Sequence, residues 1–319
     1  LGWKPIGNNS HSFTGAYNGQ GHTIDGLYIN RPDESGLGLF GYTEEAVIAN
    51  LGLINADITG YASTAILAGR SLEGTVITNC YATGIVTGLY QVTAGLVGLL
   101  DQESSVIDGY TDVVVNGWEM VGGLVALSHS DCVISNCNTT GSVNGHNTVG
   151  GLVGTMHSGT IIDSFSSANI TATGNSTGGF AGRIDQYCSV INCYSTGNVS
   201  GTNSIGGFAG YLWAVGIENS LFDKCYSTGL VIGEQYVGGF IGYSESNTMS
   251  NCFSSGSVTG DQFVGGLIGY GNYTTIINCH SKGNVEGNNY TGGFVGRQYY
   301  SHLNDSFSSG NVSGDQYVG

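Results

Sequence analysis

Apolar residues recur along this chain in columns that repeat about every 28 residues. The clearest column is the third position of a Gly-Gly-(Leu/Phe)-x-Gly motif, as in residues 150–154 and 178–182. It holds leucine or phenylalanine in every unit: Leu39, Leu67, Leu96, Leu124, Leu152, Phe180, Phe208, Phe240, Leu267 and Phe294. Such a regular period indicates an array of repeats in which each unit packs on its neighbours.

A second block follows each motif after about ten residues and adds two apolar columns. The first reads Ile77, Val106, Ile134, Ile161, Val190, Phe222, Met249, Ile276 and Leu303. The second reads Val86, Val115, Val143, Ile170, Val199, Val231, Val258, Val285 and Val312. The short β-branched and aromatic runs, separated by Gly, Asn, Ser and Asp, predict three strands and three turns per unit. Helix is disfavoured, because glycine costs about 1 kcal/mol inside a helix and no 3.6-residue apolar stripe persists.

Three strands per unit and columns of constant side-chain size predict an all-β fold, a parallel β-solenoid of about ten coils. Each coil of about 28 residues should advance by the ~4.8 Å spacing of paired strands. A propeller is the competing architecture, but its blades need about 40–50 residues and four strands each. We expect residues 1–35 to form a lead-in and first coil, and residues 36–319 to form repeats that continue beyond the ends of this sequence.

The Gly-Gly pair of the motif has a structural explanation. Two residues without Cβ let facing walls of the coil approach closely, or let the chain adopt a positive φ. A phosphate-binding loop also uses such glycines, but no helix follows here and no Lys-Ser/Thr completes the motif.

Composition narrows the possible partners. The chain has 56 Gly, 2 Pro and a formal net charge of −16. Collagen is excluded because no Gly-X-Y period runs through the sequence, and a disordered linker because 40% of the residues are hydrophobic. The acidic balance argues against nucleic acid as a partner, and no apolar run is long enough to insert into a membrane.

The motif at residues 150–154, followed by Ile-x-(Asn/Asp)-Cys-Tyr-Ser-x-Gly-x-Val-x-Gly, resembles the GLUG-motif repeat family. The segments Trp3-Lys4-Pro5-Ile6-Gly7 and 13–24 resemble the lead-in that precedes its first repeat. The family occurs in large secreted and surface proteins of bacteria and archaea, including non-catalytic parts of immunoglobulin A peptidases. The resemblance implies an extracellular structural or adhesive module at the cell surface, with no catalytic residues and no cofactor.

Six of the eight cysteines share one column of the second block: Cys80, Cys137, Cys193, Cys225, Cys252 and Cys279. Other units place Gly or Ser there, so the position selects small side chains. Because neighbours in a column have parallel Cα–Cβ vectors with Cβ atoms ~4.8 Å apart, a disulfide fits poorly. We therefore expect a buried, mostly reduced thiol ladder.

The next column is mainly aromatic: Tyr81, Tyr110, Asn138, Phe165, Tyr194, Tyr226, Phe253, His280 and Phe307. If the cysteines point inward, alternation turns these rings outward, where they could bind sugars or a second rod. Alternatively, the chain bends at the preceding Asn/Asp column and the rings occupy a corner of the core; we favour this second arrangement. The Asn/Asp column would then form a hydrogen-bonded turn ladder.

Two further features are candidate sites. Three residues past the motif, successive units align Asp101, His129, His157 and Asp185, which could chelate a divalent metal or form a pH-sensitive patch; we favour instead a solvated loop edge on which these polar residues coincide by chance.

The single long insertion, residues 211–220, contains Trp213 and is our candidate recognition loop.

Nine Asn-x-Ser/Thr sequons are candidate glycosylation sites: Asn8, Asn138, Asn169, Asn175, Asn198, Asn272, Asn289, Asn304 and Asn311.

Two functions compete. The first is a non-enzymatic surface stalk, adhesin or filament subunit that binds further repeats of its own kind, head to tail or laterally, and possibly surface glycans. It is favoured by the repetition and by the absence of a unique constellation of reactive residues. The second is a carbohydrate-active β-helix enzyme or a glycan-binding domain. An enzyme would need acidic and basic groups converging in one groove, whereas the seven Lys and Arg residues are scattered along the sequence.

Overall fold

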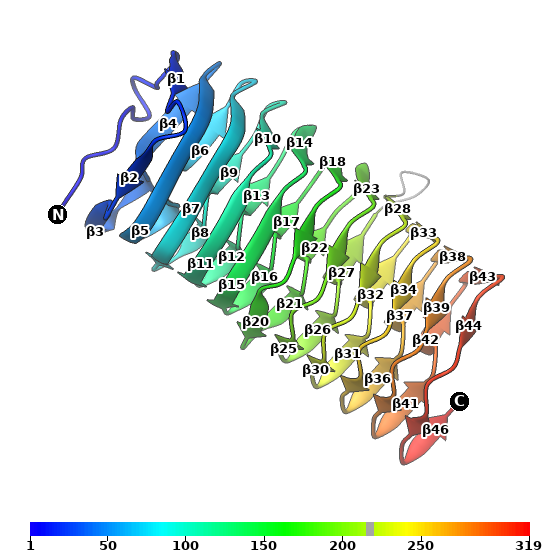
Figure 1. The fold of residues 1–319 in the computed structure, drawn as a ribbon. Coiled ribbons are helices and arrows are strands. Elements are labelled where there is room, and N and C mark those ends of the chain that lie inside the picture. Colours follow the sequence, from blue (N-terminus) through cyan, green and yellow to red (C-terminus); the bar gives the residue numbers. More distant parts are fainter. Residues whose placement is uncertain (215–219) are drawn as a thin grey trace.

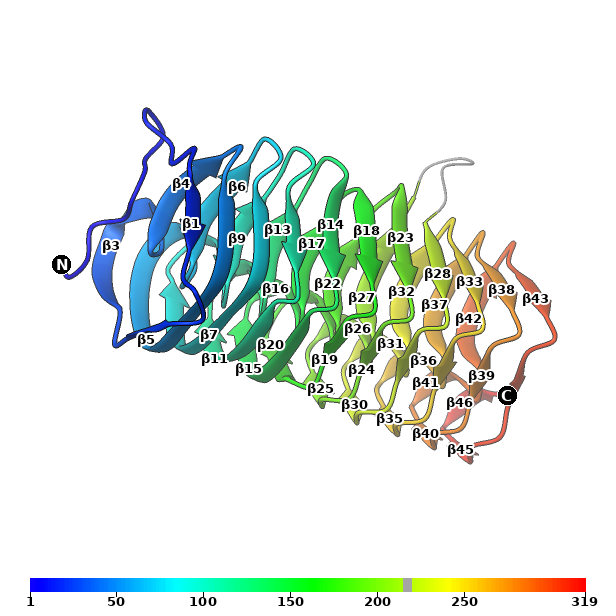
Figure 2. The ribbon, with the colours of Figure 1, turned by 45° about the horizontal axis from the view of Figure 1, so that its top comes forward.

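The computed structural model describes residues 1–214 and 220–319. In these residues the chain is all-β, a parallel β-solenoid of about 11 turns that runs from the N-terminal to the C-terminal end of the rod (Figures 1 and 2). The predicted fold class is confirmed. None of the described residues belongs to a helix long and apolar enough to cross a membrane.

One face of the rod is a ten-stranded parallel sheet in which each coil supplies one strand. Its strands follow the Gly-Gly motif of each unit, so their spacing along the chain is the repeat period. In order, they are β4 (Phe40–Glu44), β6 (Ala68–Leu72), β9 (Val97–Leu100), β13 (Val125–Ser128), β17 (Val153–Met156), β22 (Ala181–Ile184), β27 (Ala209–Trp213), β32 (Ile241–Glu245), β37 (Ile268–Asn272) and β42 (Val295–Tyr299).

The other faces belong to a sheet with 36 strands in the described residues. Its strands also pair in parallel from one coil to the next. They are β1 (Ala16–Asn18), β2 (Thr23–Asp25), β3 (Tyr28–Leu37), β5 (Val47–Thr64), β7 (Val76–Gly88), β8 (Gln91–Ala94), β10 (Ser105–Ile107), β11 (Tyr110–Asn116), β12 (Glu119–Gly122), β14 (Cys132–Ser135), β15 (Asn138–Gly145), β16 (Asn147–Gly150), β18 (Gly159–Ile162), β19 (Phe165–Ser166), β20 (Asn169–Ala172), β21 (Asn175–Gly178), β23 (Cys188–Ile191), β24 (Tyr194–Ser195), β25 (Val199–Ser200), β26 (Asn203–Gly206), β28 (Leu221–Asp223), β29 (Tyr226–Ser227), β30 (Val231–Ile232), β31 (Gln235–Gly238), β33 (Thr248–Ser250), β34 (Phe253–Ser254), β35 (Val258–Thr259), β36 (Gln262–Gly265), β38 (Thr275–Ile277), β39 (His280–Ser281), β40 (Val285–Glu286), β41 (Asn289–Gly292), β43 (His302–Asn304), β44 (Phe307–Ser308), β45 (Val312–Ser313) and β46 (Gln316–Val318).

A coil in the second half of the rod contains five short strands instead of the three expected. The coil that holds β23 to β27 is an example. The break between β23 and β24 coincides with a residue in the left-handed region, Asn192 with φ 55°. Asparagine tolerates this conformation because its side chain bonds locally. The left-handed residue Asn192 therefore divides a predicted strand without disturbing the parallel pairing of β23 and β24 with the neighbouring coils.

The predicted columns form the core. Consecutive members are joined by backbone hydrogen bonds, from Leu124 N to Leu152 O at 2.9 Å and from Leu152 N to Phe180 O at 2.8 Å. Phe180 and Phe208 are fully buried and their rings stack with centroids 4.5 Å apart. Like-sized side chains thus lie directly over one another, which is how a continuous interior avoids voids.

Close approach, and not a positive φ, explains the Gly-Gly pair. A Cβ on Gly207 would lie 2.1 Å from the carbonyl oxygen of Gly239 in the next coil. Across the interior of the same coil, Ser195 Oγ donates a hydrogen bond of 2.6 Å to the Gly207 carbonyl, and Ser227 Oγ repeats this bond to Gly239 at 2.5 Å. The glycines bring the two walls close enough for this buried polar cross-link.

We expect Gly207→Ala to lower the free energy of unfolding by about 1–3 kcal/mol, because the added methyl group must push two coils apart. Gly271→Ala is the matched control, since a Cβ there would meet its nearest atom at 3.6 Å, an ordinary contact. Thermal unfolding followed by circular dichroism measures both variants. Equal melting temperatures for the two variants would contradict the close-approach explanation.

Candidate functional site

The aligned His and Asp residues form one polar cluster at the end of the strands β13, β17 and β22. The rings of His129 and His157 have centroids 4.2 Å apart. His157 Nδ1 lies 2.6 Å from Asp185 Oδ2, and Arg183 Nε lies 2.6 Å from Asp185 Oδ1. Asp101 lies near enough for its charge to act on the pKa of His129. The predicted register is therefore a real cluster, and it includes an arginine that the sequence pattern did not associate with it.

The cluster is arranged as an ion-pair network. The Asp185 side chain is 5% exposed and both of its oxygens already have cationic or imidazole partners. Within residues 1–214 and 220–319, no group of three or more His, Cys, Asp or Glu residues is placed to hold a metal ion. Arg183 occupies the position in which a divalent cation would have to neutralise Asp185, so the geometry favours the pH-sensitive patch over chelation.

The cysteine column lies inside the coil. All eight cysteines are buried and none of them forms a disulfide in the structure. Burial raises the pKa of Cys80 and Cys132 to about 11 and that of Cys137 to about 12. Such thiols remain protonated at neutral pH, and a protonated thiol is a poor nucleophile and a poor metal ligand.

The aromatic column lies outside the coil, which overturns the corner arrangement that we favoured. After the turn at Asn192, Cys193 points inward, Tyr194 outward and Ser195 inward. Alternation therefore restarts immediately after the left-handed residue instead of being lost at the bend. The Asn/Asp column does form the predicted ladder, for example from Asn278 Nδ2 to Asn251 Oδ1 at 2.7 Å.

The outer rings stack on one another along the rod. Tyr194 and Tyr226 have centroids 4.8 Å apart with planes at 3°, and Tyr226 and Phe253 repeat this distance at 5°. Within the stack, each ring face is covered by the ring of the next coil and only the ring edges meet solvent. Tyr194, Tyr226, Phe253 and His280 therefore each have a ring on both faces, which stabilises the coils and leaves these four rings no open face on which a sugar could stack.

Trp213 lies in β27 and not at the tip of the insertion. It is half-buried, pairs with Glu245 of β32, and lies 5.8 Å from the guanidinium carbon of Arg183. Residues 215–219 of the predicted recognition loop lie outside the described residues. What the structure describes of this segment, residues 211–214 and 220, belongs to or borders the sheets.

The sequons differ in exposure. Six of their asparagines are exposed: Asn8, Asn169, Asn175, Asn198, Asn304 and Asn311. Asn138, Asn272 and Asn289 are half-buried, and Asn272 Nδ2 donates to Glu245 Oε1 at 3.1 Å. Asn198 Oδ1 accepts a bond from the Leu230 backbone N–H, which leaves its amide nitrogen, the atom that would carry a glycan, directed to solvent.

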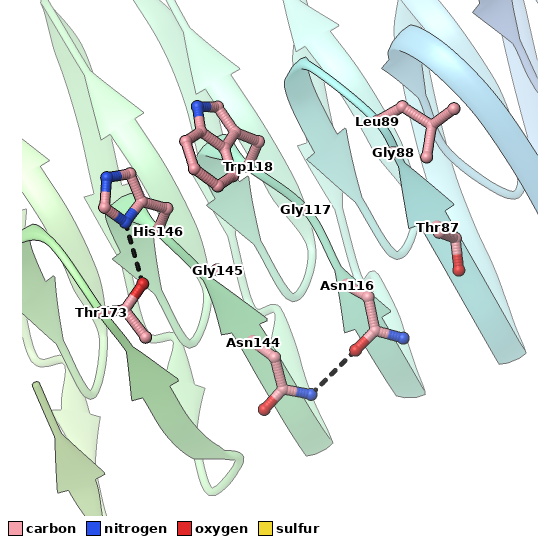
Figure 3. A pocket seen from close by; sticks show the side chains of 10 residues that line it. All are labelled: Thr87, Gly88, Leu89, Asn116, Gly117, Trp118, Asn144, Gly145, His146 and Thr173. Carbon is pink, nitrogen blue, oxygen red and sulfur yellow. Dashed lines mark hydrogen bonds between the residues drawn. The ribbon is translucent and has the colours of Figure 1, made fainter. Parts of the chain in front are cut away.

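A groove that the sequence analysis missed crosses the turns after β7, β11, β15 and β20 (Figure 3). It is shallow and has a volume of about 430 Å³. Trp118, 51% exposed, stands at its rim and stacks on His146 with centroids 4.3 Å apart. Beside these rings, Asn144 Nδ2 donates to Asn116 Oδ1 at 3.0 Å (Figure 3).

The turn glycine positions these side chains. A Cβ on Gly117 would meet the Val121 side chain at 2.7 Å, so the chain turns tightly there and presents the following residue, Trp118, to solvent. Most other units carry small or polar residues at this position, for example Thr202 and Asp261. The signal available in the sequence was a large aromatic residue directly after a turn glycine, in a column without a constant residue type.

The His129 cluster predicts a pH-dependent stability. Burial and the neighbouring His157 lower the pKa of His129 below its usual 6.5, although Asp101 and Asp185 act in the opposite direction. Between its lowered pKa and 6.5 the unfolded chain binds more protons than the folded one, so stability should rise with pH in that window. His129→Gln should flatten the rise of the melting temperature measured between about pH 5 and pH 7. An unchanged slope would show that His129 does not contribute.

The buried thiols predict low reactivity. In the native chain, a thiol-specific aromatic disulfide reagent at neutral pH should modify the cysteines slowly, because all eight are buried and burial raises the pKa of thiols such as Cys80, Cys132 and Cys137. In guanidinium chloride all eight should react. Rapid modification of several cysteines under native conditions would contradict the buried placement, and fewer than eight in denaturant would reveal oxidation.

Comparison with known proteins finds a family model and two relatives that match parts of the chain. Four segments match the family model described as the GLUG motif: residues 173–200, 233–259, 264–286 and 287–313. Over 59 residues the chain is 46% identical to a putative Gly-rich membrane protein of Evansella cellulosilytica, a match that covers 18% of this chain and 7% of that protein. Over 107 residues the chain is 35% identical to halomucin of Haloquadratum walsbyi. This match covers 32% of this chain and 1% of halomucin.

The matches span only a small part of both relatives, and no solved structure matches the chain significantly. Each segment that matches the family model occupies about one coil of the solenoid and contains the Gly-Gly motif followed by the second block. The agreement between motif and coil shows that the chain contains GLUG-motif repeats in these four segments, which together make up about a third of its length.

Proposed function

We propose that this chain is a stiff, non-enzymatic segment of an extracellular cell-surface repeat protein, with a structural or adhesive role. The observation that carries the proposal is the ten-stranded sheet, in which strands pair in register from β4 to β42. Each coil is hydrogen-bonded to the next along the whole sheet, so the rod resists bending and holds its two ends apart. A stiff segment of this kind can hold the parts of a surface protein at its two ends at a fixed distance from each other.

The names of the relatives support a surface location: one is described as a membrane protein and the other is halomucin. The partners that we propose are further repeats of the same kind, in the same chain or in a second copy, because a coil edge is complementary to another coil. The six exposed sequon asparagines suit glycosylation at such a surface.

The ion-pair network speaks against the enzyme alternative. Glycosidases use two carboxyl groups that face the substrate, one as acid and one as base or nucleophile. The most deeply buried carboxylate of the His129 cluster, Asp185, is instead engaged by Arg183 and His157. Both of its oxygens are thus engaged by groups of the protein and do not face a substrate site.

The location is tested on intact cells of the source organism. Antibodies raised against the purified chain should label cells before permeabilisation, and external protease should remove the label. Labelling that requires permeabilisation would overturn the surface proposal. The non-enzymatic part is tested separately: the purified chain should release no reducing ends from plant or algal polysaccharides, and sustained release would restore the enzyme alternative.

A further inference from the structure

We propose that the groove beside Trp118 is a binding site for a neutral oligosaccharide. The proposal concerns a ligand of the rod surface and does not depend on where the whole protein resides. It is derived from the exposed ring of Trp118, the amide groups next to it and the absence of charge from the groove lining.

Trp118 offers an open aromatic face. Among the described residues His146 is the ring that stacks on it, with planes at 25°. On the side of the preceding coil the groove is lined by Thr87 and Leu89, and no aromatic ring from that coil stacks on Trp118 in the described part of the chain (Figure 3). This differs from the outer aromatic column, where rings of neighbouring coils cover one another. An exposed indole with one free face can pack against the apolar face of a sugar ring.

The neighbouring amides offer hydrogen bonds of both kinds. The bond from Asn144 Nδ2 to Asn116 Oδ1 leaves the Asn116 amide nitrogen as a donor and Asn144 Oδ1 as an acceptor, neither of which has a protein partner in the described residues. His146 Nδ1 is engaged with Thr173 Oγ1 at 2.8 Å, which fixes the ring beneath Trp118. Sugar hydroxyls both donate and accept, so they can satisfy this pair.

The lining carries no charged side chain, although the chain as a whole has a formal charge of −16. An ionic ligand would find no counter-charge in the groove, and an acidic one would also be repelled by the surrounding chain. A peptide that added a strand would need unpaired backbone groups, whereas the strands here pair with the coils on both sides, as β11 does with β7 and β15. These constraints select a neutral polyhydroxylated ligand.

A polymer fits the groove better than a single sugar. The groove crosses four coils, and its polar groups recur from coil to coil at about the strand spacing of ~4.8 Å. Several residues of a chain laid along the rod would each meet one turn, and their weak contacts would add. The affinity for a short oligosaccharide should therefore increase with its length.

The test uses the purified chain and six-residue oligosaccharides of defined linkage: β-1,4-glucan, β-1,3-glucan, α-1,4-glucan, β-1,4-mannan and chitin, with hexagalacturonic acid as the charged probe. Binding is detected by saturation-transfer NMR and quantified by titration. We expect at least one neutral hexasaccharide to bind more tightly than its trisaccharide, and hexagalacturonic acid not to bind. No binding by any neutral hexasaccharide, or equal binding of the acidic one, would overturn the proposal.

Variants locate the site. Trp118→Ala should weaken binding by at least about tenfold, Trp118→Phe by less, since a smaller ring keeps part of the stacking surface. Because Trp118 is 51% exposed, neither change should alter the melting temperature appreciably. Tyr273→Ala, which removes a 55% exposed ring from a turn far from the groove in sequence, is the matched control and should bind as the unmodified chain does. If Trp118→Ala binds normally, the groove is not the site.

Discussion

Parallel hydrogen bonding between successive coils is the constraint on which this structure depends. Because Ala181 of one coil pairs with Ala209 of the next, and Ala209 with Ile241, a strand residue inside the rod has a fixed counterpart in the coils on both sides. A side chain that points inward must fit against the same position in two neighbours. This explains the unbroken Leu/Phe column, the small residues of the cysteine column and the repeated bond from an inner serine to a Gly-Gly carbonyl.

The same constraint leaves the turns free to vary. A residue that follows a turn glycine touches solvent, and its identity does not affect the interior. The groove at Trp118 occurs at such turns, whereas the network of His129, His157 and Asp185 lies at a different edge of the coil, where β13, β17 and β22 end. The rod therefore combines an interior that is nearly invariant from unit to unit with edges that can acquire local chemistry in a few units.

The features that recur in every unit could be predicted from the sequence, whereas features present in only one or a few units were missed. The interior columns, the solenoid and the alignment of His129 with His157 follow from spacing alone, and the structure contains each of them. The side of the aromatic column was wrong, because a left-handed residue such as Asn192 changes the direction of the chain without altering its alternation. Arg183 and Trp118 were missed because no column of like residues marks them; their partners are known only once the coils are placed.

The hydrogen bond from an inner serine to a glycine carbonyl joins two walls of the same coil, so this stabilising contact lies entirely within one unit. The two edges of such a unit are complementary to each other, since equivalent residues of successive coils pair in parallel, as β26 does with β21 and β31. Duplicating or deleting the DNA for one unit would therefore leave no mismatched junction. Recombination within the gene can therefore change the length of the rod in increments of ~4.8 Å, and a change outside the coils of the Trp118 groove and the His129 cluster leaves both of these in place.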